Sequence, residues 1–325
     1  MLAIEVDELG DASVLKWVEK PDPTPGPGEV AIRVSYTGVN FADIQARRGA
    51  YHGGEKPPFI PGIDCAGTIT AVGSGVDTLR TGQRVAAFPF GGSYAEVVIA
   101  QAKLCYPLPD AVSDQAAATI LMLVTAYNTI TLAGRMQKGD TILIHAAAGG
   151  VGSIAMQIAR VLGAGKIFAT AGDAEKVAIA KKTGADVAID YNKEDFAERV
   201  KAQTDGKGVD VILDSVAGDV FTKGLPVLAN YGRYVIYGKA SGKAGTVETD
   251  MLHSSNRAVL GYSSGAMRKQ RPEGLRPAAE ATLQLVAQGK VTPLIGETYA
   301  LKDASKAHQH VESRKSHGKT LLDAK

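Results

Sequence analysis

The sequence predicts an α/β protein that combines a doubly wound parallel sheet with a second, β-rich domain. From residue 141 onward, short apolar runs alternate with helical patterns, which is typical of parallel strands joined by helical crossovers. Before residue 125, short strand patterns follow one another between glycine and proline clusters. The 325 residues are also long for one hydrophobic core, so two domains are expected.

The β-rich domain is expected first in the chain, over residues 1–125. Its strand patterns lie at 3–6, 29–36, 65–72 and 84–88. The segment 113–132 is helical in composition, and Ser113 is its expected N-cap because a serine hydroxyl accepts hydrogen bonds from free N–H groups at a helix start. This segment leads into the second domain.

The second domain is expected over residues 126–265. After a first strand at 141 and its helix, the pattern gives strands at 166–171, 187–189, 209–215, 232–237 and 258–260, and a helix at 174–182. Pro272 and Pro277 then interrupt the chain. A helix at 278–288 is expected to stop at Gly289, and a last helix is expected at 303–314.

The stretch 141–161, TILIHAAAGGVGSIAMQIARV, predicts a strand, a tight turn and a helix. Small side chains from Ala146 to Gly152 let the backbone approach a ligand, and the helix start presents N–H groups and a positive dipole end. Against the fingerprint G-x-G-x-x-G, Ala147 takes the first glycine's place, and Gly149 and Gly152 are the second and third. The stretch therefore predicts a Rossmann dinucleotide site, and the alternative is merely tight packing of a helix on a strand.

The same stretch resembles the quinone oxidoreductase and zeta-crystallin family of the medium-chain dehydrogenase/reductase superfamily. The signature spacing is carried by Gly139, Asp140, Leu143, Ala147–Gly150, Gly152, Gln157 and Arg160, and further similar segments lie at 34–49, 59–73, 92–98 and 121–128. The resemblance implies a zinc-free, NADPH-dependent reductase of quinones or other conjugated carbonyls. It also implies that the β-rich domain is a partly open, GroES-like barrel that binds the substrate, and that residues 266–325 return to it. The substrate domain, 1–125 and 266–325, is then discontinuous.

Composition and charge argue against several other classes. A net charge of +2 gives no reason to expect nucleic acid or an acidic membrane as the main partner. We see neither an apolar segment of membrane length nor the pattern of a signal peptide at the start, MLAIEVDELG. Cys65 and Cys105 are too few for a disulfide framework, which favours a reducing cytoplasm.

A zinc site is not expected from this sequence. A catalytic zinc needs three protein ligands, and a structural zinc in the long dehydrogenases needs four closely spaced cysteines. Where zinc-dependent relatives have Cys-His and His-Glu, this chain has Asn40-Phe41 and Ile63-Asp64. The six histidines are scattered along the chain. The sequence therefore predicts no metal.

The choice of nicotinamide cofactor depends on the end of the second parallel strand. An NAD site expects an acidic residue there, but the strand ends at Ala171-Gly172, and Lys176 supplies a cation for a 2′-phosphate. By resemblance, Gly172, Lys176, Tyr191 and Arg314 hold the adenosine phosphate, and NADPH is expected. Asp173 departs from the small or hydroxyl residue expected at its position.

The reaction centre is less clearly specified. Hydride transfer needs position and polarity more than an acid–base pair, because a quinone's product oxyanion is weakly basic. By resemblance, Asn40, Asp43 and Tyr51 border the nicotinamide and the substrate. Asn40 is a candidate donor to a developing oxyanion, and its alternative role is that of a turn residue. The other expected cofactor contacts, from resemblance, the fingerprint or strand ends, are Thr125, Thr129, Gly149, Gly150, Val151, Gly152, Val216, Gly238, Ser241, Gly261, Tyr262 and Ser263.

Other functions remain open at this stage. A reductase of α,β-unsaturated ketones or aldehydes would use the same fold and cofactor. Some relatives act as lens crystallins or bind AU-rich RNA, and only the basic segment 314–319, RKSHGK, favours RNA here. The resemblance also implies a homodimer.

Overall fold

The computed structural model describes residues 1–50 and 56–325, and the chain divides into two compact units. Unit 1 comprises Met1–Leu123, Met267–Gly289 and Pro293–Lys325; unit 2 comprises Val124–Ala266 and Lys290–Thr292. Two helices lie across the divisions, α3 (Ile120–Asn128) and α9 (Ser264–Gln270). The return of residues 290–292 to unit 2 has no signal in the sequence.

Unit 2 is built on a parallel sheet that, in the described residues, has six strands in the order β10-β9-β8-β11-β12-β13. Counted along the chain this is 3-2-1-4-5-6, the doubly wound Rossmann order, so the predicted fold of this part is confirmed. The strands are β8 (Thr141–Ile144), β9 (Lys166–Ala171), β10 (Val187–Asp190), β11 (Val209–Asp214), β12 (Leu228–Ile236) and β13 (Ala258–Gly261).

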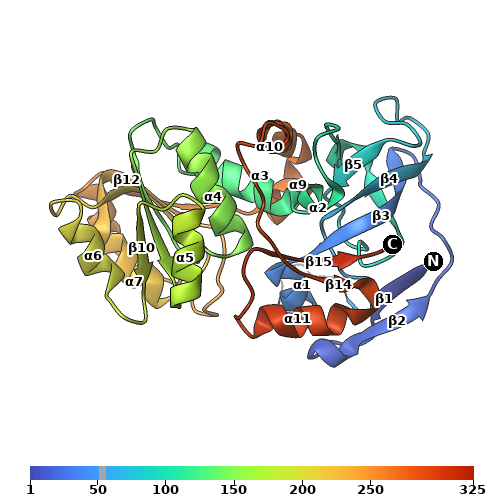
Figure 1. Cartoon of the computed structure of the whole chain (residues 1–325), viewed down its shortest axis with the longest axis horizontal. Coiled ribbons are helices and arrows are strands. Elements are labelled where there is room, and N and C mark those ends of the chain that lie inside the picture. The colour runs from blue at the N-terminus through green and yellow to red at the C-terminus, as the bar shows by residue number, and fades with distance from the viewer. Residues whose placement is uncertain (51–55) are drawn as a thin grey trace. The chain divides into compact units, whose positions relative to one another are not determined.

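The helices of unit 2 cover both faces of this sheet, with α4 and α5 on one side and α6 and α7 on the other (Figure 1). They are α4 (Gly150–Val161), α5 (Ala174–Lys182), α6 (Phe196–Ala202), α7 (Asp219–Gly224) and the short α8 (Thr249–His253). Asp173 and Asp195 cap α5 and α6, because their carboxylates accept hydrogen bonds from the first free N–H groups. A core that includes Leu143, Phe168 and Ile212 is buried between the layers.

Unit 1 is β-rich, as predicted. Its larger sheet has the order β14-β15-β3-β4-β5-β7, with β6 pairing with β3, and the strands β1 and β2 form a separate pair. The strands are β1 (Leu2–Val6), β2 (Leu15–Glu19), β3 (Glu29–Val39), β4 (Cys65–Val72), β5 (Arg84–Ala87), β6 (Val97–Gln101), β7 (Cys105–Pro107), β14 (Ile295–Ala300) and β15 (Lys319–Asp323). The C-terminal strand β15 pairs antiparallel with β3, which brings Leu321 opposite Gly38.

The helices of unit 1 are α1 (Phe41–Arg47), α2 (Asp114–Ala117), α10 (Arg276–Ala287) and α11 (Ala304–Glu312). Ser113 caps α2 as predicted, because its hydroxyl accepts a hydrogen bond from the Ala116 N–H. The predicted interruption at Pro277 is wrong. This proline lies in the first turn of α10, where a missing N–H costs no helical hydrogen bond.

No helix among residues 1–50 and 56–325 is long and apolar enough to cross a membrane.

Candidate active site

The glycine-rich loop of unit 2 follows β8 and leads into α4. Ala146 has φ 52°, a left-handed conformation, and the turn is closed by a hydrogen bond from Gly149 N to the Ala146 carbonyl oxygen at 3.0 Å. The Ala147 N–H donates to the Thr170 carbonyl oxygen at 3.0 Å. Gly149 is the N-cap of α4, and no side chain caps this helix start. The first N–H groups of a twelve-residue helix are therefore left for an anion.

Gly152, the third glycine of the fingerprint, lies against the loop that precedes α4. A Cβ atom at this position would lie 2.6 Å from the Ala146 carbonyl oxygen and 2.8 Å from the Ala147 Cα. Both are backbone atoms of the loop. The third glycine therefore lets α4 pack closely against its own loop, and in this way shapes the site.

The residues expected around the adenosine phosphate lie partly together. A Cβ on Gly172 would lie 2.4 Å from the Tyr191 hydroxyl, so the two residues are in direct contact. Asp173 accepts a hydrogen bond from the Lys176 backbone N–H at 2.7 Å, and its carboxylate lies 3.5 Å from the Lys176 ammonium. Arg314 belongs to unit 1, where it follows α11 with φ 59°. Of the four predicted residues, three therefore lie together in unit 2.

Three further predicted cofactor residues lie at the carboxyl ends of β11 and β12. Asp214, the last residue of β11, accepts hydrogen bonds from the N–H of Val216 at 2.6 Å. The Ser241 N–H donates to the Val216 carbonyl oxygen at 3.0 Å. A Cβ at Gly238 would lie 2.8 Å from the Ser215 carbonyl oxygen. These backbone contacts bring Val216, Gly238 and Ser241 together beside the point where the strand order reverses, which is where doubly wound sheets bind ligands.

Side chains of α3, among them the predicted cofactor residue Thr125, contact residues that follow β13. The Thr125 hydroxyl of α3 lies 2.7 Å from the Ser264 hydroxyl, and Asn128 donates to the Tyr262 hydroxyl at 2.9 Å. The Thr129 hydroxyl donates to the Ala126 carbonyl oxygen within the same helical segment. Thr129 is fully buried, so its hydroxyl serves the helix itself.

His145 is a polar residue at this sheet edge that the sequence did not single out. It follows β8 directly and is 1% exposed, with Nδ1 2.9 Å from the Thr170 hydroxyl. Burial lowers the pKa of this imidazole to about 4, so it is neutral at physiological pH. Its ring meets Phe196 edge to face. Its place directly after a buried strand is the sequence signal that could have indicated it.

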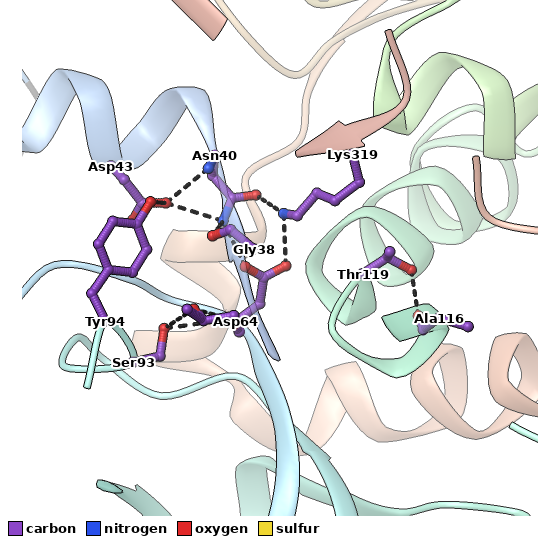
Figure 2. A network of polar contacts seen from close by, with 10 residues as sticks. Gly38, Asn40, Asp43, Asp64, Ser93, Tyr94, Ala116, Thr119 and Lys319 are labelled. Atoms are coloured by element: carbon purple, nitrogen blue, oxygen red, sulfur yellow. Dashed lines mark hydrogen bonds and ion pairs between the residues drawn. The ribbon is translucent and has the colours of Figure 1, made fainter. Parts of the chain in front are cut away.

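Unit 1 contains a compact, buried polar cluster made by Asn40, Asp43, Asp64 and Lys319 (Figure 2). The Lys319 ammonium donates to Asn40 Oδ1 at 2.6 Å and to Asp64 Oδ2 at 2.9 Å. Asn40 Nδ2 donates to Asp64 Oδ1 at 2.6 Å and to Asp43 Oδ2 at 3.2 Å. The three side chains Asn40, Asp64 and Lys319 thus form a closed ring.

The chain forms this cluster by bringing three distant segments together. Asn40 follows β3 and is the N-cap of α1, and its backbone N–H donates to the Asp43 carboxylate at 2.9 Å in the first turn of that helix. Asp64 precedes β4, and its carbonyl oxygen accepts hydrogen bonds from Thr37 and from the Gly38 N–H. Lys319 begins β15, the strand that pairs with β3.

The charges of the cluster are nearly sealed from water. Asp43 is 2% exposed, Asp64 is fully buried and Lys319 is 1% exposed. Burial and the neighbouring Asp64 charge raise the pKa of Asp43 to about 7. Burial also raises the pKa of Asp64, and Lys319 partly opposes that rise. The site therefore holds an acid that titrates near neutral pH beside a tight ion pair.

A second group of buried polar side chains extends from Asp43 toward α11. The Tyr94 hydroxyl lies 3.5 Å from Asp43 Oδ2 and 3.0 Å from His308 Nε2. Burial raises the pKa of Tyr94 well above its ordinary value and lowers the pKa of His308 to about 3. Arg47, also buried, pairs with Glu312 and donates to the Gly10 carbonyl oxygen.

The structure places the predicted reaction-centre residues unevenly. Asn40 and Asp43 lie together, whereas Tyr51 lies outside the described residues. Both hydrogens of the Asn40 amide have acceptors inside the cluster, which favours an organising role for Asn40 over donation to an oxyanion. Lys319 is part of the basic segment 314–319, yet it is buried and bonded. No pattern in the sequence indicates its pairing with Asp64, 255 positions away.

Among the residues that the structure describes, no three His, Cys, Asp or Glu side chains gather in a group that would hold a metal ion.

Comparison with known proteins gives two matching domains. The pattern that defines the alcohol dehydrogenase GroES-like domain matches residues 26–110, and that of the zinc-binding dehydrogenase domain matches residues 150–280. A quinone oxidoreductase from Salmonella typhimurium is 36% identical over 98% of both chains. Quinone oxidoreductase-like protein 2 from Bos taurus is 34% identical over 95% of this chain and 89% of its own. The solved structure of Escherichia coli quinone oxidoreductase complexed with NADPH is similar with a TM-score of 0.92 and 34% identity, covering 99% of this chain and 100% of that one.

Proposed function

Because the chain belongs to the quinone oxidoreductase family of the medium-chain dehydrogenase/reductases, we propose that it reduces small quinones with NADPH by hydride transfer, without a metal ion. The observation that carries this proposal is the loop before α4. It joins an uncapped helix start to the strand-order reversal, and a similar chain is described as a complex with NADPH. Bound NADPH would supply the hydride from nicotinamide C4.

The unit 2 sheet edge would hold the cofactor. The free N–H groups of Gly150, Val151 and Gly152 at the start of α4 suit a pyrophosphate, because they combine hydrogen-bond donors with the positive end of the helix dipole. Lys176, beside Gly172 and Tyr191, would pair with the 2′-phosphate. In this proposal Val216, Gly238, Ser241 and the segment 261–263 contact the rest of the dinucleotide.

The buried cluster of unit 1 would serve the substrate side. Quinone reduction consumes one hydride and one proton, and Asp43 is the group whose pKa of about 7 lets it hold a proton at neutral pH. Its Oδ2 accepts from the Asn40 backbone, the Asn40 amide and Tyr94, which leaves Oδ1 as the oxygen able to carry that proton. We assign Asp43 the proton-holding role and Asn40 the role of orienting it.

Zinc independence rests on the identity of the side chains. Asn40-Phe41 and Ile63-Asp64 stand where zinc-dependent relatives have Cys-His and His-Glu, and in this chain Asn40 and Asp64 bind the Lys319 ammonium. An amide oxygen and one carboxylate already paired with a lysine are a poor set for zinc, which prefers thiolates and imidazoles.

The test is the initial rate of NADPH oxidation with a panel of quinones and α,β-unsaturated ketones, after exhaustive chelation of metals. Turnover with quinones that survives chelation is the expected result. A clear preference for the enones would replace the substrate class and keep the cofactor. Activity that is lost to the chelator and restored by zinc would overturn the proposal.

A variant tests the cofactor separately. Lys176→Ala should raise the KM for NADPH about tenfold or more and leave the KM for NADH nearly unchanged, since only NADPH carries the 2′-phosphate. Lys181→Ala, an exposed lysine on the same helix, is the matched control. Equal effects of Lys176→Ala on both cofactors would place Lys176 away from the phosphate.

We also propose a cytoplasmic homodimer. Cys65 and Cys105 are buried free thiols, as a reducing compartment favours. The strand β13 is an edge of the unit 2 sheet, where a second copy would add its own β13. Sedimentation velocity of the wild type and of Val259→Pro, a substitution within β13, tests the pairing.

A further inference from the structure

We infer that the Lys319 ammonium is the built-in cation of the buried cluster, a positioning residue that holds the Asn40 amide and the Asp64 carboxylate in one orientation. The inference deepens the proposed reductase and rests on it only where catalytic activity is the readout. The ammonium lies between the Asn40 oxygen and the Asp64 carboxylate and donates to both.

The contacts define which atom of Asn40 faces which partner. An ammonium group only donates hydrogen bonds, so the atom 2.6 Å from Lys319 Nζ must be the Asn40 oxygen. The Asn40 nitrogen then faces Asp64 Oδ1 at 2.6 Å and the Gly38 carbonyl oxygen at 3.2 Å. The acceptors around the Asn40 nitrogen favour this orientation of the amide, and the ammonium completes it because it donates to the Asn40 oxygen. Lys319 therefore helps to hold the direction of the group that contacts Asp43.

The backbone is also built to admit this side chain. Gly38 lies on β3 directly beside β15, and a Cβ at Gly38 would lie 2.0 Å from Lys319 Cε and 2.4 Å from Nζ. Real Cβ atoms do not approach other atoms so closely. The missing side chain of Gly38 is thus the space that the lysine occupies, which is independent of the hydrogen bonds as an indication of a built site.

The charges around the cluster explain why a cation is needed. Asp43 comes from α1 and Asp64 from the segment before β4, and both carboxyls are buried. The other polar side chains nearby are neutral: the Asn40 amide and the Tyr94 hydroxyl contact the carboxyls, the hydroxyls of Thr37 and Ser93 contact the Asp64 backbone carbonyl, and the imidazole of His308 lies beyond Tyr94. Arg47 acts from farther away, on Tyr94 and His308. Among the described residues, Lys319 is therefore the cation in direct contact with a carboxyl of the cluster, that of Asp64.

The first experiment removes the Lys319 ammonium by substitution and supplies a small alkylammonium ion in solution in its place. Lys319→Ala should lower kcat for quinone reduction about tenfold to a hundredfold, because small displacements of positioning groups cost rates of this order. Methylammonium or ethylammonium should restore part of kcat and raise the Tm of Lys319→Ala, with no effect on the wild type. Tetramethylammonium has the same charge and no N–H donor, and should do neither. Lys302→Ala, at an exposed lysine of unit 1, is the control.

The second experiment needs no substrate and uses Lys319→Met, which keeps an apolar stem in the cavity. Its Tm difference from the wild type should grow as the pH rises from about 5 to about 8, since carboxyls without a cation bind protons more tightly in the folded chain. A Lys319→Met variant that folds at the lower pH and does not fold at the higher pH would support the inference most strongly. An equal loss at both pH values, small or complete, would overturn it and indicate a packing role only.

The two experiments separate this inference from the proposed function. If the wild type reduces no quinone, the proposed function fails, and the Tm readouts with amines and with pH still decide the role of Lys319. If the wild type is active but no small amine stabilises or reactivates Lys319→Ala while the Lys319→Met difference is independent of pH, the inference about Lys319 fails alone.

Discussion

The two units build their polar sites in opposite ways. In the glycine loop of unit 2, the residues are consecutive in the chain, from Ala146 to Gly152, and they act through backbone N–H groups and through space left by small side chains. In unit 1 the cluster joins residues 40, 43, 64 and 319 and acts through buried charged and amide side chains. The first site is therefore sensitive to added volume, and the second to altered charge.

The largest effect is expected where side-chain volume is added in the glycine loop of unit 2. Gly152→Val should abolish NADPH binding and destabilise the fold by about 3 kcal/mol or more, because the new side chain would meet loop backbone atoms that cannot yield. Cofactor titration by fluorescence and urea unfolding measure the two losses. Gly152→Ala should show the same losses to a smaller extent. Normal NADPH affinity in the valine variant would show that α4 does not need this close approach.

The second prediction adds side-chain volume in unit 1, at the glycine beside Lys319. Gly38→Ala should destabilise the protein by about 1–3 kcal/mol, because its Cβ overlaps the Lys319 side chain. In the Lys319→Ala background that overlap disappears, and the cost of Gly38→Ala should fall by roughly 1–2 kcal/mol. Urea unfolding of the wild type, the two single variants and the double variant completes this double-mutant cycle. Additive effects would mean that the space at Gly38 is not kept for the lysine.

This contrast also explains what could be predicted from sequence. The order of strands and helices in unit 2 follows from local patterns, and the glycine loop is visible because spacing alone defines it. The backbone atoms that Gly152 faces could not be named in advance, because the sequence does not say which part of the loop lies nearest to it. Asp64 and Lys319 could not be paired in advance, because their contact depends on β15 joining β3. A lysine before the apolar run Leu321–Leu322 is indistinguishable from a surface residue until that pairing is known.

The next prediction removes a side-chain charge with little change in side-chain volume. Burial and Asp64 raise the pKa of Asp43 from about 3.8 to about 7, so the folded chain binds this proton more tightly than the unfolded chain does. Stability from Asp43 is thus present at low pH and is lost as the pH rises through about 7. Asp43→Asn removes that dependence. Relative to the wild type, its unfolding free energy should increase across this window by roughly 4 kcal/mol at most, at about 1.4 kcal/mol per pKa unit.

Urea unfolding of both proteins between about pH 4 and pH 8 measures the difference for Asp43→Asn. Asp7→Asn, at an exposed residue of unit 1, is the control and should show no such trend. A constant difference between Asp43→Asn and the wild type at all pH values would mean that Asp43 stays ionised in the folded protein.

The smallest effect is expected at the sheet edge of unit 2, where a charge stands in an otherwise backbone-built site. Asp173 caps α5, and its carboxylate lies 3.5 Å from the Lys176 ammonium, so it competes with a 2′-phosphate for that cation. Asp173→Ser keeps an oxygen for the cap and removes the charge. The ratio of kcat/KM for NADPH over NADH should rise about threefold to tenfold, with the gain shrinking at high salt because the pair is exposed. An unchanged ratio would mean that Asp173 serves only the helix, and that volume alone governs this site.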